Sequence, residues 1–279
     1  MKRTHAIRVE PGKRVSLDDI STRPPKDIDR DDANAELAEL EEELGELQEL
    51  MWGARQHGVL VVLQGRDTAG KDGAIKRVVG SLNPRGVQVV SFGPPTEEEL
   101  QHDFLWRVHK HAPRKGEFSI FNRSHYEDVL VVRVHDLVKE SVWRPRYEHI
   151  VDFETMLSQE GCIVLKFFLH ISKDEQRARL LDREKDAAKA WKLNPGDWKE
   201  RRYWSEYSQA YEDVFKRCST ELAPWHIVPA DSKWYRNLSI AQAIVQVLRP
   251  HKDEWVDTLT EKGKLGREAL KELEKEDRG

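Results

Sequence analysis

The stretch that decides the fold is GVLVVLQGRDTAGKD, residues 58–72. Its first part, residues 58–64, is almost continuously apolar, as expected of a parallel strand that is buried on both faces. Gly65 and Gly70 follow, separated by four residues, and Lys71 comes directly after. This spacing lets successive backbone N–H groups curl around a phosphate while the lysine ammonium reaches its outer oxygens. Because the loop follows a strand and opens a helix, the stretch predicts a phosphate-binding loop.

Two positions depart from the ATPase version of this loop. Asp72 stands where a Ser or Thr hydroxyl would hold magnesium, and Asp67 lies inside the loop beside the bound anion. A carboxylate next to phosphates is repulsive unless a divalent cation lies between them, so we predict that Asp67 binds magnesium. An acidic residue in the first helical turn is favourable without any metal, which accounts for Asp72. The residues expected to line the phosphate site are Gly65, Arg66, Thr68, Ala69, Gly70, Lys71 and Asp72.

A second polar cluster, SIFNRSHYED, ends the third predicted strand at residues 119–128. In phosphate-loop enzymes a strand end in this region usually offers an aspartate to the metal. This chain has Asn122, a neutral and weaker oxygen ligand. Arg123 beside it is placed to neutralise phosphoryl oxygens. An isolated arginine is more often a surface ion-pair partner, but the neighbouring phosphate loop favours the functional interpretation.

Apolar and helical segments alternate along the chain, which predicts an α/β protein with a mostly parallel five-stranded sheet covered on both faces. A leucine stripe between residues 37 and 50 favours core or subunit packing. The expected strands are residues 58–64, 86–92, 117–122, 162–171 and 225–229. The expected helices are residues 31–56, 71–82, 97–111, 125–140, 144–159, 173–186, 198–218 and 236–249.

The chain divides into an extended N-terminal arm (1–30), one phosphate-loop domain (31–252) and a charged helical tail (253–279). Within the domain, residues 173–217 alternate in charge and contain tryptophans, and this pattern usually indicates a solvated helix pair. Kinases, however, commonly close an arginine-bearing lid over the reacting phosphates to exclude water. We therefore predict a lid here, with Arg183 and Lys192 as its phosphate-binding residues.

The composition sets limits on partners and location. Charged residues make up 34% of the 279 residues, and no apolar run is long enough to span a bilayer. The N-terminus lacks the apolar core of an export signal, so we expect a cytoplasmic protein whose two cysteines are reduced. Residues 27–50 carry eleven acidic residues and one basic residue. Together with the lack of a groove-reading motif, this disfavours a nucleic-acid ATPase.

Taken together, the motifs resemble the second family of polyphosphate kinases. The resemblance implies a three-layer α/β/α fold similar to thymidylate kinase, with a helical lid. It also implies transfer of a terminal phosphoryl group between inorganic polyphosphate and a nucleotide, with Mg²⁺ as the cofactor and Mn²⁺ as a substitute. The motifs are Gly65-Arg-Asp67-x-x-Gly70-Lys71, Phe121-Asn122-Arg123-Ser124-His125-Tyr126, the turn Gly93-Pro94-Pro95-Thr96, and Lys189-x-Trp191-Lys192-x4-Asp197.

By motif position, the resemblance implies that Asp67 is a metal-binding catalytic aspartate. It likewise implies that Lys71, Arg123 and Arg183 bind the phosphate chain. The subgroup with Asn at this position resembles enzymes that accept both AMP and ADP, so Asn122 implies both acceptors. Phosphorylation of ADP would give ATP. The residues expected on the nucleotide side are Gly93, Pro94, Pro95, Thr96, Asn122 and Glu127.

Two rival interpretations share these motifs. An ATP-dependent nucleoside or nucleotide monophosphate kinase would have the same fold and differ in its donor. A non-catalytic polyanion-binding protein would use the basic residues without turnover. The physical argument for transfer is that a nucleotide acceptor presents an ionised oxygen and needs no strong base, so alignment and charge neutralisation suffice. The leucine stripe also suggests a homo-oligomer, either a dimer or a tetramer.

Overall fold

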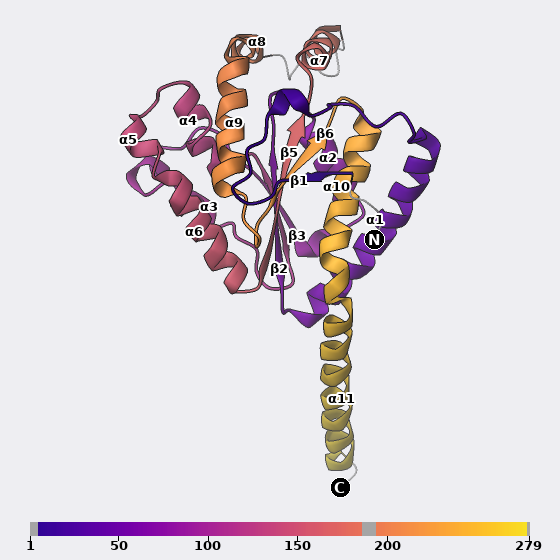
Figure 1. Ribbon diagram of the computed structural model, residues 1–279. Helices are drawn as coiled ribbons and strands as arrows, with labels where there is room; N and C mark the ends of the chain where they lie inside the picture. Colours follow the sequence, from indigo (N-terminus) through magenta and orange to yellow (C-terminus); the bar gives the residue numbers. More distant parts are fainter. Residues whose placement is uncertain (1–4, 186–193, 278–279) are drawn as a thin grey trace.

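A six-stranded sheet forms the centre of the computed structural model, which describes residues 5–185 and 194–277 (Figure 1). The strand order is β1-β6-β5-β2-β4-β3, and every pairing except that of β1 is parallel. All seven residues of β2 are buried, which confirms a strand covered on both faces. The five parallel strands match the prediction: β2 (Gly58–Gln64), β3 (Val87–Ser91), β4 (Phe118–Asn122), β5 (Cys162–His170) and β6 (Trp225–Pro229).

The sixth strand, β1 (Ile7–Arg8), lies in the segment predicted to be an extended arm. It pairs antiparallel with β6, with Ile7 opposite Ile227, and so adds an edge that the sequence did not predict. A two-residue strand carries no periodic pattern, which is why it was missed. The segment also packs on the core through Val9 and Leu17, which are each 2% exposed, and it forms the short turn η1 (Leu17–Asp19).

Helices cover both faces of the sheet and give three layers (Figure 1). One face carries α1 (Arg30–Ala54), α2 (Lys71–Val78) and α10 (Lys233–Leu248). The other carries α6 (Arg146–Gln159) and α9 (Trp204–Cys218). The predicted leucine stripe lies along α1, where Leu37, Leu40, Leu44 and Leu47 are at most 8% exposed. These four leucines therefore build the core of the chain itself and do not form a subunit interface.

Three predicted helices were wrong in extent. Residues 97–111 form only short helical turns, because Asp103 accepts hydrogen bonds from the backbone N–H groups of Leu105 and Trp106 and starts a new turn. Residues 125–140 are broken at Val129 and Leu130, which leave the helical conformation, and again at Asp136, which takes φ +49°. The helix predicted at 198–218 is interrupted at residues 201–203. The short elements are η2 (Pro84–Gly86), η3 (Glu99–Gln101), α3 (Trp106–His109), η4 (His125–Asp128), α4 (Val131–Val134), α5 (Glu140–Trp143), α8 (Pro195–Glu200), η6 (Arg201–Tyr203) and η7 (Arg249–His251).

The topology points to one edge of the sheet as the ligand site. The chain leaves β2 toward β3 and β4 on one side, then returns to build β5 and β6 on the other. In open parallel sheets, ligands bind beyond the carboxyl ends of the strands, where the connections diverge. The helices α7 (Lys173–Lys185) and α8 lie at this end of the molecule, at the top of Figure 1.

The last helix, α11 (Lys252–Glu276), projects from the opposite end of the molecule (Figure 1). Its first turns are anchored, since Trp255 is fully buried and Leu259 lies against Gly53. Further along, Leu265, Leu270 and Leu273 are each at least 60% exposed. Within the residues that the structure describes, no helix combines the length and the apolar character needed to cross a membrane.

Candidate active site

The loop between β2 and α2 has the backbone of a phosphate cradle. Gly70 takes φ +99° and Thr68 takes φ +65°, both in the left-handed region, which turns the chain back on itself. Ala69 N donates to Arg66 O at 3.0 Å, and Ala74 N begins the helical ladder at Gly70 O. The loop therefore closes around a small concavity and ends at a helix N-terminus, where anions bind favourably.

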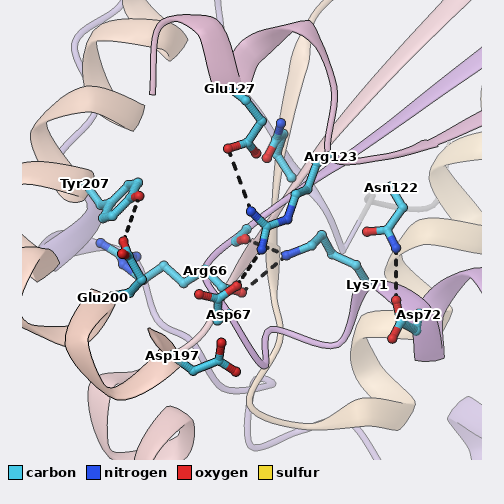
Figure 2. A network of polar contacts seen from close by, with 12 residues as sticks. Arg66, Asp67, Lys71, Asp72, Asn122, Arg123, Glu127, Asp197, Glu200 and Tyr207 are labelled. Carbon is cyan, nitrogen blue, oxygen red and sulfur yellow. Dashed lines mark hydrogen bonds and ion pairs between the residues drawn. The ribbon is translucent and has the colours of Figure 1, made fainter. Parts of the chain in front are cut away.

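Lys71 lies across this cradle rather than on the surface (Figure 2). The side chain is buried, and its Nζ donates to Gly65 O at 2.7 Å. Burial, with the positive charge of Arg123 as a second cause, lowers the pKa of Lys71 to about 8. The ammonium is held inside the loop without a full complement of negative charge, so a bound anion would be strongly attracted to it.

Arg123 faces the loop from the end of β4. Its Nη2 lies 2.8 Å from Asp67 Oδ1 and its Nη1 lies 4.0 Å from Glu127 Oε2. Burial alone would lower the pKa of Arg123, but the charges of Glu127 and Asp67 outweigh it and the pKa is raised. The pKa of Glu127 is raised in turn, mainly by burial. The three side chains predicted as catalytic, Asp67, Lys71 and Arg123, are thus brought together.

Asn122 connects the end of β4 to the helix that follows the loop. Its Nδ2 donates to Asp72 Oδ1 at 2.9 Å (Figure 2). The bond gives Asp72, which sits in the first turn of α2, a second interaction besides the helix dipole. It also turns the amide oxygen of Asn122 away from Asp72. That oxygen is the ligand atom which a metal role for Asn122 requires.

A cleft of about 370 Å³ opens above these residues. Asp197 of α8 lines its far side, and its pKa is raised, first by burial and second by the negative charge of Asp67. The carboxylates of Asp67, Asp72 and Asp197 and the amide of Asn122 line this cleft, and oxygen ligands of this kind suit a hard divalent cation such as Mg²⁺. The cleft is lined by Asp67, Thr68, Gly70, Lys71, Asp72, Gly73, Asn122, Arg123, Arg183, Asn194 and Asp197.

The lid residues are placed only in part. Arg183 reaches the cleft from α7 and donates to Asp197 Oδ2 at 2.9 Å. This ion pair links α7 to α8, the two helices of the predicted lid that flank residues 186–193 in the sequence. Lys192, the second lid residue predicted to bind phosphate, lies outside the described residues, as do Lys189 and Trp191.

Arg66 differs from the other loop residues because its side chain leaves the cradle. The guanidinium stacks on Trp204 at 3.9 Å and donates to Ser208 Oγ at 2.5 Å, both on α9. Burial lowers its pKa to about 10. The side chain lines a smaller cavity of about 40 Å³ beside Arg123 and Tyr207. Arg66 therefore ties the loop to α9, and only its backbone belongs to the cradle.

The turn predicted for the nucleotide side follows β3, next to Asn122. Phe92 N donates to Asn122 O at 3.0 Å, and Gly93 O accepts from Arg107 Nη1 at 3.0 Å. Pro94, Pro95 and Thr96 are exposed. The turn lies at the correct edge of the sheet, but none of its residues lines the cleft described above.

Two residues that support the loop were not among the predicted site residues. Arg179 Nη1 donates to Thr68 O at 2.9 Å and to Ala69 O at 3.1 Å. Gln176 Nε2 donates to Asp67 O at 3.0 Å. Both project from α7 onto the back of the loop and fix its carbonyl groups. Arg179 stands in a segment of alternating charges, so its sequence context did not distinguish it from a solvated arginine.

A group of metal-binding residue types also lies at the opposite end of the sheet. Ligand atoms of His57, His251 and Glu254 fall within 4.8 Å of one another. However, Trp255 Nε1 donates to His57 Nδ1 at 3.0 Å, which requires the tautomer with its proton on Nε2. A neutral histidine that binds a metal through Nε2 carries its proton on Nδ1 instead. The cluster therefore fits packing of α11 on the core better than metal binding.

Comparisons with known proteins agree with this geometry. The family model described as polyphosphate kinase 2 matches residues 27–255. An "AMP/ADP-polyphosphate phosphotransferase" of Meiothermus ruber is 51% identical over 251 residues, which cover 86% of this chain and 91% of that protein. An "ADP-polyphosphate phosphotransferase" of Rhodopseudomonas palustris is 39% identical and covers 92% of this chain and 93% of its own length.

The fold comparison gives the same answer. The crystal structure of polyphosphate kinase 2 from Arthrobacter aurescens TC1 superposes with a TM-score of 0.82 at 40% identity, covering 87% of this chain and 90% of that one. The three-layer phosphate-loop kinase fold predicted from the sequence is confirmed. On its sequence, its fold and the geometry of its loop, the chain belongs to the polyphosphate kinase 2 family.

Proposed function

We propose that this protein transfers the terminal phosphoryl group of inorganic polyphosphate to ADP, and also to AMP, in a reversible reaction that forms ATP and ADP. One observation carries the proposal. The loop holds its own carboxylate, Asp67, against Arg123 at the mouth of a cleft that also contains Lys71. An anionic chain can bind there only if cations balance that carboxylate. The named activities of the Meiothermus and Rhodopseudomonas relatives support the same donor.

The charged residues of the cleft would have separate roles in phosphoryl transfer. Lys71 and Arg123 would hold the oxygens of the phosphoryl group in line between donor and acceptor. Arg183 would add positive charge from the lid side and help to exclude water. The acceptor phosphate is already ionised, so no side chain has to remove a proton from it. Positioning and charge neutralisation therefore supply the catalysis.

Phosphoryl transfer by kinases generally uses a divalent metal. We propose Mg²⁺, with Mn²⁺ as a substitute, held by Asp67 and Asn122. When bound, the ion would neutralise charge on the phosphoryl oxygens. The all-oxygen donor set of the cleft supports this assignment. Asn122 contributes one negative charge fewer than an aspartate would, which reduces the repulsion of the phosphates of AMP or ADP as alternative acceptors.

We also propose that the protein works as a homo-oligomer, either a dimer or a tetramer. The leucine stripe that first suggested self-association is buried within the chain. Support comes instead from Leu265, Leu270 and Leu273 on the projecting part of α11, which are exposed. We expect the reaction to take place in the cytoplasm, where its nucleotide substrates are held.

The donor distinguishes this function from an ATP-dependent monophosphate kinase. Purified protein is incubated with AMP and magnesium and given either long-chain polyphosphate or ATP, and ADP is measured by chromatography. We expect ADP with polyphosphate as the donor in the absence of ATP. Formation of ADP from ATP and AMP alone, with polyphosphate inert, would support the rival kinase instead.

A further inference from the structure

Lys166 lies in the middle of β5, where the surrounding residues are apolar. Its side chain is fully buried, and in the pairing of β5 with the central strand β2 it lies opposite Val62. A buried ammonium is costly unless each donor finds an acceptor. Lys166 Nζ has three: Glu154 Oε2 at 2.5 Å, Tyr126 Oη at 2.9 Å and Cys218 O at 2.7 Å. All three N–H groups of the lysine are therefore used.

Glu154 of α6 completes the network. It is 1% exposed, and its Oε1 accepts from Tyr126 Oη at 2.8 Å and lies 3.2 Å from His125 Nε2. Burial alone would raise the pKa of Glu154, but the charge of Lys166 and the contact with His125 hold it below its ordinary value. Glu154 is thus ionised, and its charge is paired in the protein interior.

The network of Lys166 and Glu154 contacts the chain shortly after Arg123. His125 and Tyr126 are two of its members, while Arg123 itself has φ +62°, a conformation that costs free energy for a residue other than glycine. Such a conformation persists only where the surroundings impose it. Fixing Tyr126 in the core therefore fixes the direction in which Arg123 leaves β4.

The other side of the same turn is fixed to the phosphate loop. Arg123 N donates to Leu63 O at 3.0 Å. Gln64, the last residue before the loop, donates to Ser124 Oγ at 3.1 Å, and the same oxygen accepts from Tyr126 N at 3.2 Å. The turn is therefore held between the end of β2 and the buried network.

Lys166 also reaches the helix that faces the loop. Its bond to Cys218 O occupies a carbonyl at the C-terminal end of α9. The same helix carries Trp204 and Ser208, which receive the side chain of Arg66. The ammonium of Lys166 thus contacts η4 through Tyr126 and α9 through Cys218, and both elements approach the phosphate loop from the same layer of helices.

We propose that Lys166, Glu154 and Tyr126 form a positioning unit that aims the guanidinium of Arg123 at the phosphate loop. The inference rests on the proposed function, because it assigns Arg123 a role in transfer. Stability does not explain the unit, since a buried ion pair contributes little or nothing compared with well-packed apolar side chains. A lysine in the core of a central strand is better explained by what it holds in place.

Tyr126→Phe tests the unit, because it removes the hydroxyl that bonds to both Lys166 and Glu154 and leaves the contact between Glu154 and His125 in place. Tyr147→Phe is the matched control: Tyr147 is buried in the same layer and its hydroxyl accepts from Arg133, away from the loop. We expect kcat for polyphosphate-dependent transfer to fall at least tenfold in Tyr126→Phe, with KM for the nucleotide within twofold. We expect Tyr147→Phe to keep the wild-type kcat. Equal kcat values for the two variants would overturn the proposal.

A double-mutant cycle shows whether the effect passes through Arg123. In an Arg123→Lys background, Tyr126→Phe should lower kcat less than twofold further. If the tenfold loss is repeated there, Tyr126 acts independently of Arg123 and the proposal is wrong. Should Tyr126→Phe fail to fold, as judged by thermal melting, Glu154→Gln takes its place in the same cycle.

Polyphosphate affinity separates this inference from the proposed function. Isothermal titration with polyphosphate should show at least fivefold weaker binding for Tyr126→Phe and unchanged binding for Tyr147→Phe. A wild-type protein without turnover would contradict the proposed function, yet this difference in binding would still support the positioning unit. Normal turnover of the wild-type protein together with an unchanged kcat in Tyr126→Phe, whatever its affinity, would contradict the positioning unit alone.

Discussion

The Nη2 atom of Arg123 lies 2.8 Å from Oδ1 of Asp67, so that an arginine from the end of β4 is paired with a carboxylate inside the phosphate loop. Both side chains line the cleft that contains Lys71. On the proposed function, a polyphosphate chain entering the cleft would compete with Asp67 for Arg123, and a divalent cation would then balance the carboxylate.

Removing the charge of Asp67 should change polyphosphate affinity and the rate of phosphoryl transfer in different ways. We expect Asp67→Asn to lower kcat by about 100- to 1,000-fold, the range seen when one group that stabilises transition-state charge is removed. Affinity for polyphosphate should stay the same or increase, because a negative charge beside the anion is gone. Steady-state kinetics and titration calorimetry measure the two quantities. Asp257→Asn, an exposed position on α11, serves as the control.

If Asp67→Asn retains wild-type turnover, the carboxylate is not a metal ligand in transfer. The loop would then resemble the ATPase version more closely than its sequence suggests.

We predict that the buried charge of Lys71 lowers the stability of the fold but is needed for turnover. Its pKa is about 8 in the folded chain and about 10.5 when unfolded, so the folded state carries the charged lysine at a cost of up to about 3 kcal/mol near pH 7. Lys71→Met should therefore keep or raise the melting temperature while lowering kcat at least about 100-fold. Lys76→Met, an exposed lysine of the same helix, should change neither quantity. A large loss of stability in Lys71→Met would mean that the lysine is structural.

Gly70 should tolerate no side chain. Its φ of +99° is strained for any other residue, and a Cβ there would overlap Arg236 Nη1. Gly70→Ala should cost about 1–3 kcal/mol of unfolding free energy and weaken polyphosphate binding, because an alanine at φ +99° favours a different backbone conformation of the loop and also displaces the guanidinium of Arg236. Chemical denaturation measures the first and titration the second. Gly266→Ala, on an open helix surface, should be neutral or slightly stabilising, and a similar result for Gly70→Ala would contradict the loop geometry.

The stability of the fold should fall in mild acid. Burial, the main cause, lowers the pKa of His226 to about 4 from an ordinary value of 6.5. Below pH 6.5 the unfolded chain therefore takes up a proton that the folded chain does not, and stability is lost from about pH 6.5 down to about pH 4. The pKa values of His57 and His170 are lowered as well, mainly by burial, and act in the same direction.

Melting curves between pH 7.5 and pH 4.5 test the contribution of His226. The loss for this one residue amounts to up to about 3 kcal/mol, and His226→Phe should make the decline visibly shallower. A decline of the same size in the variant would show that other groups cause it.

The sequence predicted the parallel strands because each is a short apolar run, and these runs depend little on tertiary context. It did not predict β1, which pairs with β6 through only two residues. The helix boundaries at residues 97–111 were wrong because Asp103 bonds to nearby backbone N–H groups. Those at residues 125–140 were wrong because the backbone leaves the helical region at Leu130 and Asp136, and a hydrophobic pattern reveals neither feature.

Within the site, the sequence predicted which residues converge but not what supports them. Asp67, Lys71 and Arg123 were recognisable because loop spacing and strand ends place them at one edge of the sheet. Arg179 and Gln176 contact the loop from more than 100 residues away along the chain, so only the folded structure shows their role. Lys166 appeared in the sequence merely as an interruption of an apolar run, and its three partners come from η4, α6 and α9.

Formation of ATP from ADP and polyphosphate is the sharpest test of the proposed donor. Purified protein is mixed with ADP, magnesium and long-chain polyphosphate, and ATP is followed by luciferase luminescence, with Asp67→Asn measured in parallel. We expect ATP that depends on both polyphosphate and magnesium and that is nearly absent with the variant. No ATP from the wild-type protein, or equal amounts from the wild-type protein and the variant, would contradict it.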